Sequence, residues 1–275
     1  MPFCDIATGS SHGRLHFTHN GIKTSGPHLV LIHGAGGEVR CWPATWRLAA
    51  AAQGSVGLSI SRDSARITNH SVYAIDLPGH GRSTGPALDT IDSLADTVEQ
   101  FIEAQGIERV VIVGHSMGGA IALTLAARNN PRIVGQIIVA SAAKIGVTDD
   151  ILKGLKSDFE KTVDFIVKYS FDRASGPFFP KKAREYTLAT GADATHADFL
   201  ACSTFDLRSQ LGEIALPTLV IAAENDRMIP HKHSAGLVEA LPNGQLETFT
   251  DCGHYPHLDR TTLVEAPIAS FCAAL

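Results

Sequence analysis

The feature that most constrains the fold is Ser116 in the pattern Gly-x-Ser-x-Gly, which the sequence GHSMG provides at residues 114–118. An apolar run, RVVIV, precedes this pattern, and a helical pattern, AIALTLAARN, follows it. In that context the pattern predicts a sharp turn from a buried strand into a helix, with small neighbours around a serine in a strained conformation. The turn would raise the Ser116 hydroxyl clear of the sheet and aim the first N–H groups of the helix at it. The sequence therefore predicts a nucleophilic serine at the end of a buried strand.

Apolar runs alternate with helical patterns along most of the chain. The expected strands are residues 28–34, 71–76, 109–115, 135–141, 217–224 and 245–251. The expected helices are residues 41–52, 89–105, 116–129, 231–241 and 261–275. Valine, isoleucine and leucine on both faces of the runs are typical of strands that helices cover on both sides. The alternation predicts the α/β class, with a mostly parallel, doubly wound sheet.

A long segment, residues 145–210, interrupts the alternation. It holds helical patterns, the longest at residues 149–170, and no run that resembles a core strand. We therefore expect a helical insertion between two core strands, with residues 1–144 and 211–275 forming the core.

Two shorter segments also depart from the simple pattern. Residues 53–70 are too long for a direct helix-to-strand loop, so we expect a surface excursion or a small hairpin there. Residues 13–21 are expected to form an antiparallel edge strand near the N-terminus, with a turn at Asn20 and Gly21.

A serine hydroxyl is a weak nucleophile that needs a base and a group to orient that base. His254 is the candidate base because it follows the last expected strand, in the sequence DCGH. His257 is its nearest rival and is expected to line the cleft or face solvent. Asp226, just beyond an apolar run, is the candidate acid, with Glu224 as the second choice. The chain order Ser116, Asp226, His254 is the order that accompanies this type of strand-to-helix turn.

The oxyanion of an acyl-transfer reaction needs N–H donors that are already in place. The amide of Met117, directly after the nucleophile, is one candidate donor. The second is expected from the glycine-rich sequence HGAGG at residues 33–37, with Ala35 as first choice and Gly34 as second. Phosphate binding by this loop is disfavoured because its spacing is not that of a dinucleotide-binding loop.

Composition excludes several classes of partner. There are 23 Lys and Arg against 28 Asp and Glu, a net charge of −5, so no basic excess would draw nucleic acid or an anionic membrane. No stretch approaches the roughly 18 apolar residues of a membrane span, and the N-terminus lacks the pattern of a signal peptide. We expect a cytoplasmic protein without a cofactor. His231 and His233 lack a carboxylate or cysteine at useful spacing, so we expect no metal site.

Five motifs together resemble those of the α/β-hydrolase superfamily, in its serine esterase and lipase-like form. They are HGAGG (33–37), DLPGHGRS (76–83), GHSMGG (114–119), END (224–226) and DCGH (251–254). The resemblance runs from about residue 28 to the end. It implies that residues 145–210 form a cap, or lid, over the active site. Residues 53–70 depart from the common pattern of the superfamily, and a contact between subunits of a homo-oligomer is one role left open for them. The resemblance also implies structural roles in the turn of the second motif for Asp76, Gly79, His80, Gly81 and Ser83.

The resemblance implies a serine hydrolase, and we expect a carboxylic ester hydrolase that forms an acyl-enzyme. A serine nucleophile argues against the dehalogenase and epoxide-hydrolase branches, which place Asp at that position. Three alternatives stay open: C–C bond hydrolysis of a vinylogous diketone acid, whose enzymes usually have Asn where His115 stands; cofactor-free perhydrolysis of the haloperoxidase type; and a receptor-like protein that binds a ligand with little turnover.

The composition of the insertion suggests the size of the substrate. Phenylalanines offer an apolar face, and lysines and aspartates offer a charged outer face. These residues are Phe159, Phe165, Phe171, Phe178 and Phe179, and Lys153, Lys156, Lys161, Asp158 and Asp164. A cap of this kind predicts a closed pocket for small to medium uncharged esters rather than the broad apolar lid of an interfacial lipase.

Overall fold

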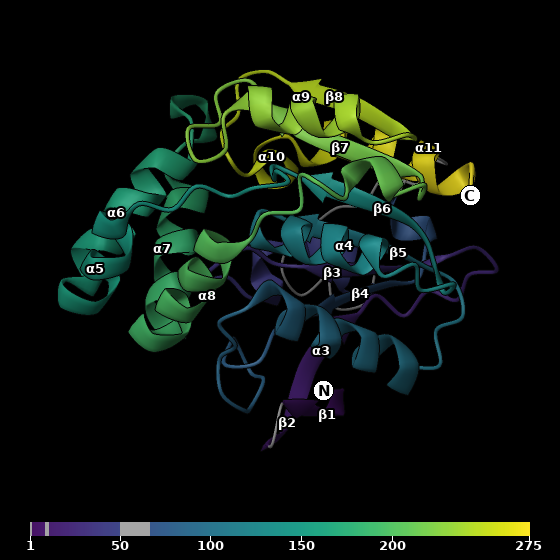
Figure 1. Cartoon of the computed structure of the whole chain (residues 1–275), viewed down its shortest axis with the longest axis horizontal. Coiled ribbons are helices and arrows are strands. Elements are labelled where there is room, and N and C mark those ends of the chain that lie inside the picture. The colour runs from purple at the N-terminus through teal and green to yellow at the C-terminus, as the bar shows by residue number, and fades with distance from the viewer. Residues whose placement is uncertain (1, 9–10, 50–66) are drawn as a thin grey trace.

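The computed structural model describes residues 2–8, 11–49 and 67–275, and these form an eight-stranded sheet with helices on both faces (Figure 1). The strand order is β1-β2-β4-β3-β5-β6-β7-β8. The strands are β1 (Phe3–Thr8), β2 (Ser11–His19), β3 (His28–Ile32), β4 (Val72–Ile75), β5 (Val110–His115), β6 (Ile133–Val139), β7 (Thr218–Ala223) and β8 (Gly244–Phe249). From β4 to β8, neighbouring strands are parallel. The predicted α/β class with a mostly parallel sheet is confirmed.

The N-terminal strands are antiparallel, and here the expected edge strand is wrong in one respect. Strand β2 pairs with β4 on one side and with β1 on the other, so the edge is β1, which the sequence did not suggest to us. Cys4 and Ile6 of β1 are buried and join the core together with Leu15 and Phe17 of β2. The first strand therefore adds apolar cover to the sheet edge rather than leaving β2 exposed.

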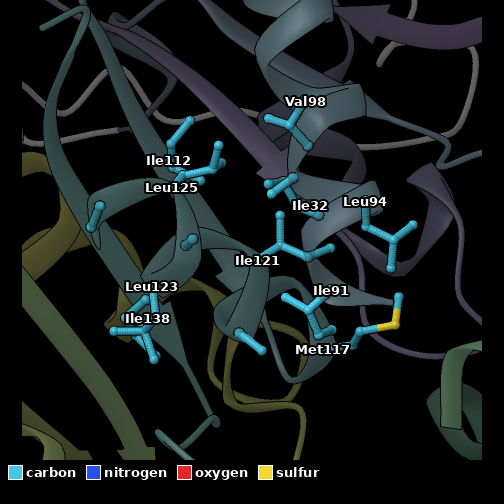
Figure 2. Packing of buried hydrophobic residues seen from close by; sticks show 14 of the residues in the cluster. Ile32, Ile91, Leu94, Val98, Ile112, Met117, Ile121, Leu123, Leu125 and Ile138 are labelled. Carbon is cyan, nitrogen blue, oxygen red and sulfur yellow. The ribbon is translucent and has the colours of Figure 1, made fainter. Parts of the chain in front are cut away.

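The core lies on both faces of the sheet because successive strand residues point to opposite sides. In β3, Val30 and Ile32 face one cluster, whereas Leu29 and Leu31 face the other. The first cluster is covered by α3, α4 and α9, and Figure 2 shows its packing at the centre of the sheet. The second is covered by α1 and α11. These helices are α1 (Ala44–Arg47), α3 (Ile91–Ala104), α4 (Met117–Ala127), α9 (His231–Ala240) and α11 (Thr261–Ala273), with α10 (Pro256–Asp259) and the 3-10 turns η1 (Val39–Cys41) and η2 (Ile67–Asn69) between them.

Within the described part of the helix expected over residues 41–52, only Ala44–Arg47 is α-helical, and residues 50–52 lie outside the described ranges. Pro43 precedes α1, where it offers no amide hydrogen and breaks continuity with η1. Trp42 and Trp46 are both buried, but only Trp46 lies on α1. Of the expected excursion, residues 53–66 lie outside the described residues.

Residues 145–210, all of which are described, add no strand to the sheet. Their helices are α5 (Asp149–Ser157), α6 (Phe159–Ser170), η3 (Arg173–Ser175), α7 (Phe178–Thr190) and α8 (Ala192–Thr204), and η4 (Leu211–Glu213) follows before β7. Helices α5 to α8 gather beyond one end of the sheet, at the left in Figure 1. We call them the four-helix insertion.

The single helix expected over residues 149–170 is wrong, because the chain breaks at Asp158 into α5 and α6. Asp158 has a non-helical backbone (φ −151°, ψ 69°) and precedes α6 at the position where aspartate favours a helix start. The two helices then fold back on each other closely: a Cβ added to Gly154 would lie 2.4 Å from Oγ1 of Thr162.

Candidate active site

Four loops that carry the predicted site residues leave the sheet at the same end. They follow β3, β5, β7 and β8, which run parallel to one another. Because the carboxyl ends of parallel strands share one edge of the sheet, these loops meet although they are far apart in the sequence.

Ser116 sits on a strained turn between β5 and α4. Its backbone has a positive φ (53°, with ψ −115°), which is rare for a residue with a side chain. Glycine is required on both sides: a Cβ at Gly114 would lie 2.0 Å from the carbonyl oxygen of Gly118, and one at Gly118 would lie 2.2 Å from that of Ile32. The turn is held by hydrogen bonds from the Ser116 amide to the Val139 carbonyl (2.9 Å) and from Ser141 Oγ to the Ser116 carbonyl (2.8 Å).

His254 and Asp226 form a buried pair. Nδ1 of His254 lies 2.8 Å from Oδ2 of Asp226, and both residues are at most 5% exposed. The carboxylate can only accept, so Nδ1 carries the proton and Nε2 is left as the acceptor in the neutral ring. Oδ1 of Asp226 accepts from the amides of Met228 and Ile229, each at 2.8 Å. These two bonds fix the carboxylate, which in turn fixes the tautomer and orientation of His254.

The backbone amide and carbonyl of His254 are both hydrogen-bonded, to two residues for which the sequence predicted no such role. Its amide donates to the carbonyl of Ser170 at the end of α6 (2.7 Å). Its carbonyl accepts from Nε2 of His115 (2.8 Å), the residue before the candidate nucleophile. Burial, followed by the neighbouring His257 and His254, lowers the pKa of His115 well below its usual range, so His115 is a neutral donor here. No sequence pattern pairs these positions.

The rival candidates lie elsewhere. His257 was expected to line the cleft or face solvent, and this is wrong: it is fully buried, its Nε2 lies 3.1 Å from the carbonyl of Cys41, and its ring packs 4.5 Å from that of Trp42. Burial lowers the pKa of His257 to about 3, which leaves the ring neutral. Glu224 is exposed, whereas Asp226 two residues later points at His254.

The candidate site opens into a cavity of about 50 Å³. Ser116, His254, Gly34 and Ala35 line it, so the structure brings together three loops that the sequence predicted to meet. Met117 is buried at the start of α4, where the first amides of a helix have no acceptor within the helix. The same cavity is also lined by apolar residues of the insertion and of the loop that leads into it.

The loop of Ala35 is a tight turn whose peptide groups are fixed from several sides. The carbonyl of Gly34 accepts from the amide of Gly37 (3.0 Å) and from Nδ1 of His33 (2.9 Å). The Gly34 carbonyl and the Ala35 amide belong to one planar peptide and point in opposite directions. Bonds that hold the carbonyl therefore turn the Ala35 N–H to the opposite side. Nε2 of His33 accepts from the amide of Leu77 (3.1 Å), which joins this loop to the next motif.

That next motif forms a compact turn around Asp76. Oδ1 of Asp76 accepts from the amide of Val39 (2.7 Å), and Oδ2 lies 2.7 Å from Nδ1 of His16 and 3.0 Å from the amide of Arg82. Gly81 has a positive φ, and a Cβ there would lie 2.3 Å from the Asp76 carboxylate. Asp76 thus ties the turn to η1 and β2.

Among the described residues, histidine, cysteine and carboxylate side chains form no group of three or more that could hold a metal ion. Within the same ranges, no helix combines the length and apolar character needed to cross a bilayer.

Comparisons with known proteins agree with this architecture. Residues 29–266 match the model of the alpha/beta hydrolase family. The chain is 30% identical over 263 residues to the pimeloyl-acyl-carrier protein methyl ester esterase of Edwardsiella ictaluri, covering 90% of this chain and 91% of that protein. It is 26% identical over 272 residues to the 2-hydroxy-6-oxo-6-phenylhexa-2,4-dienoate hydrolase of Burkholderia cepacia, covering 90% and 87%.

A solved structure shares the fold over its whole length. The enol-lactonase from Burkholderia xenovorans LB400 superposes with a TM-score of 0.83 at 22% identity, covering 99% of this chain and 100% of that one. The family match, the eight-stranded sheet and the strand-to-helix turn at Ser116 agree with one another. The chain therefore belongs to the α/β-hydrolase family and is an enzyme of the hydrolase class.

Proposed function

We propose that this protein is a serine carboxylic ester hydrolase, with Ser116 as nucleophile, His254 as general base and Asp226 as the residue that orients the base. One observation carries the proposal: Ser116 and His254 line the same cavity, while Asp226 holds His254 in the tautomer that accepts a proton at Nε2. The curated relative from Edwardsiella ictaluri, an ester hydrolase by name, supports the reaction class.

The reaction would proceed through an acyl-enzyme. Oγ of Ser116 attacks the ester carbonyl carbon as Nε2 of His254 takes the hydroxyl proton, and the amides of Met117 and Ala35, with Gly34 as second choice, stabilise the oxyanion. The C–O bond to the alcohol breaks, and the alcohol leaves with the proton from His254. A water molecule, activated by the same histidine, then attacks the acyl carbon and releases the carboxylic acid and free Ser116.

The cavity favours small to medium uncharged esters. Its lining beyond Ser116 is mostly apolar and comes largely from the four-helix insertion and its entry, including Val147, Ile151, Ile166 and Phe199. This supports a cap role for residues 145–210. None of the five phenylalanines that the sequence placed on the apolar face of the insertion lines this cavity, and Phe165 and Phe178 are exposed. The lysines and aspartates named for the outer face are all exposed, as expected.

A chain-length series tests this proposal. Each methylene that enters an apolar pocket contributes about 0.8 kcal/mol, so kcat/KM for p-nitrophenyl esters should rise by up to about fourfold per carbon and fall once the pocket is full. We expect the maximum at a short or medium acyl chain. A maximum at palmitate with strong activation by emulsified triglyceride would contradict the closed-pocket argument.

The alternatives are distinguished by the same protein sample. The relative from Burkholderia cepacia, a C–C bond hydrolase by name, keeps C–C hydrolysis of a vinylogous diketone acid as the second candidate. Release of a carboxylic acid from such a substrate, faster than from any ester in the series, would favour it. Peroxide-dependent halogenation would indicate perhydrolysis. Silence toward all of these substrates would favour a receptor-like protein.

A further inference from the structure

A buried carboxylate of the insertion reaches into the loop that is proposed to hold the oxyanion. Asp198 lies on α8 and is fully buried. Its Oδ2 accepts from the amide of Gly36 at 2.7 Å and lies 2.8 Å from Nε2 of His80. One oxygen atom thus joins three segments: the insertion, the loop after β3 and the turn after β4.

His80 carries a positive charge in this arrangement. Its Nδ1 lies 2.9 Å from the carbonyl of Pro78, and its Nε2 faces Asp198, so both ring nitrogens face acceptors. Only the doubly protonated ring can donate to both. Burial lowers the pKa of His80, but the charge of Asp198, the hydrogen bond to it and the Pro78 carbonyl outweigh burial and raise it.

The titratable groups around His80 come from each packed element. Asp198 faces it from α8, Asp76 lies at the end of β4, and the His33 ring is 4.9 Å away after β3. Burial, followed by the charge of His80, lowers the pKa of His33 to about 4, so His33 is neutral. Of these two histidines, His80 is therefore the one that carries a charge.

A second bond from the insertion reaches the same glycine. Oγ1 of Thr190, at the end of α7, donates to the carbonyl of Gly36 at 3.2 Å. The amide and the carbonyl of Gly36 are thus both bound by the insertion, directly after Ala35. The opposite side of the turn is fixed by the bonds to the Gly34 carbonyl.

We propose that Asp198, charged and paired with His80, is a positioning residue that sets the oxyanion loop from the insertion. It acts through the Gly36 amide and touches no reacting atom. This inference rests on the proposed acyl-transfer function for its effect on rate. The clamp itself is a property of the loop and can be measured without a substrate.

The test compares Asp198→Ala with Asp193→Ala, an exposed carboxylate on the same helix. For p-nitrophenyl butyrate, Asp198→Ala should lower kcat by about 100-fold, the effect of displacing one oxyanion donor, and change KM by less than about threefold. Hydrogen–deuterium exchange of the peptide that spans residues 33–40 should become faster. Asp193→Ala should match the wild type in all three measurements.

Two further variants separate positioning from general stability. Thr190→Val should fold normally and lower kcat about fivefold, in line with the loss of one neutral hydrogen bond. If Asp198→Ala does not fold, Thr190→Val tests whether bonds from the insertion to Gly36 affect kcat. In Asp198→Asn, the amide oxygen can still accept from Gly36 while His80 is protonated, but His80 loses its counter-charge. Burial then lowers the pKa of His80 in the variant, so the ratio of variant to wild-type kcat should fall as pH rises through that lowered pKa, below about 6.5, whereas a purely structural defect would keep the ratio constant.

The outcomes are distinct. An unchanged kcat and unchanged loop exchange in Asp198→Ala, or in Thr190→Val where Asp198→Ala is unfolded, overturn the inference. If the wild type hydrolyses no ester but Asp198→Ala speeds exchange in the loop, the proposed function fails while the clamp is supported.

Discussion

Replacing Asp226 by Asn isolates the tautomer of His254 without removing a side chain. The Asp226 carboxylate uses Oδ1 for the amides of Met228 and Ile229 and Oδ2 for His254. In the variant, the amide oxygen should remain with the two backbone donors, which places the NH₂ group against Nδ1 of His254. His254 must then accept at Nδ1 and carry its proton on Nε2, the tautomer that cannot take a proton from Ser116.

The structure also sets the size of the effect. To restore the active tautomer, the Asn amide would have to flip and leave the amides of Met228 and Ile229 facing an NH₂ group. Each unsatisfied buried donor costs about 1–3 kcal/mol, so the flipped form lies about 2–6 kcal/mol higher. At about 1.36 kcal/mol per factor of ten, Asp226→Asn should lower kcat by between about 30-fold and about 10⁴-fold.

The assay is the hydrolysis of p-nitrophenyl butyrate, with Glu224→Gln as the matched control. Glu224 lies two residues away and is exposed, so Glu224→Gln should retain kcat within about twofold. The melting temperature of Asp226→Asn should stay close to that of the wild type because the turn keeps its acceptor. A kcat above one third of the wild-type value for Asp226→Asn, or a large loss in Glu224→Gln, would refute the assignment of the acid.

Three other predictions follow from the site and the core. Ser116→Ala should lower ester turnover by several orders of magnitude and abolish mass addition by a fluorophosphonate, which in the wild type should label Ser116 alone; labelling of another serine would reject it as nucleophile. Because folding raises the pKa of His80, the protonated ring stabilises the folded state below about pH 6.5, and this contribution is lost as pH rises through the folded pKa. The difference in unfolding free energy between wild type and His80→Gln should therefore shrink above about pH 6.5. A difference that stays constant with pH would contradict the charged pair. In a urea titration, ester turnover should decline at lower urea than the fluorescence of Trp42 and Trp46, because the site depends on the insertion whereas both tryptophans lie in the second core cluster. Coincident transitions would show that the insertion does not open separately from this core.

Much of the fold could be predicted because the spacing of apolar residues in each segment agrees with the order in which strands and helices alternate along the chain. The parallel strands appear as short runs of branched apolar residues, and the strand before Ser116 is buried at every position. The first strand was missed because the sequence FCDIAT of Phe3–Thr8 does not alternate apolar with polar residues: Phe3 and Ala7 lie on the exposed face, opposite the buried Cys4 and Ile6. The break at Asp158 was missed because the apolar period runs through it, although an aspartate followed by Phe159 and Glu160 is a typical helix start.

The candidate catalytic residues could be predicted because each stands in a recognisable local motif. The hydrogen bonds that support them join distant segments and could not be predicted. Ser116, Asp226 and His254 each follow a strand, so their convergence follows from parallel topology. Their supports do not: Asp198 and Gly36 are 162 residues apart, and His115 and the His254 carbonyl are 139 apart. The burial of His257 could not be predicted either, because it depends on Trp42 and Cys41 from a distant part of the chain.

Besides lining the cavity, the insertion binds the two loops on which the proposed chemistry depends. Ser170 of α6 accepts from the amide of His254, and Asp198 of α8 accepts from the amide of Gly36. Three of its helices are nevertheless weakly buried, because α5 and α7 each bury one residue and α6 buries two, whereas α8 buries six. If the insertion opens to admit substrate, each opening removes the bonds from Ser170 and Asp198 together, so we expect assembly of the proposed site to accompany closure.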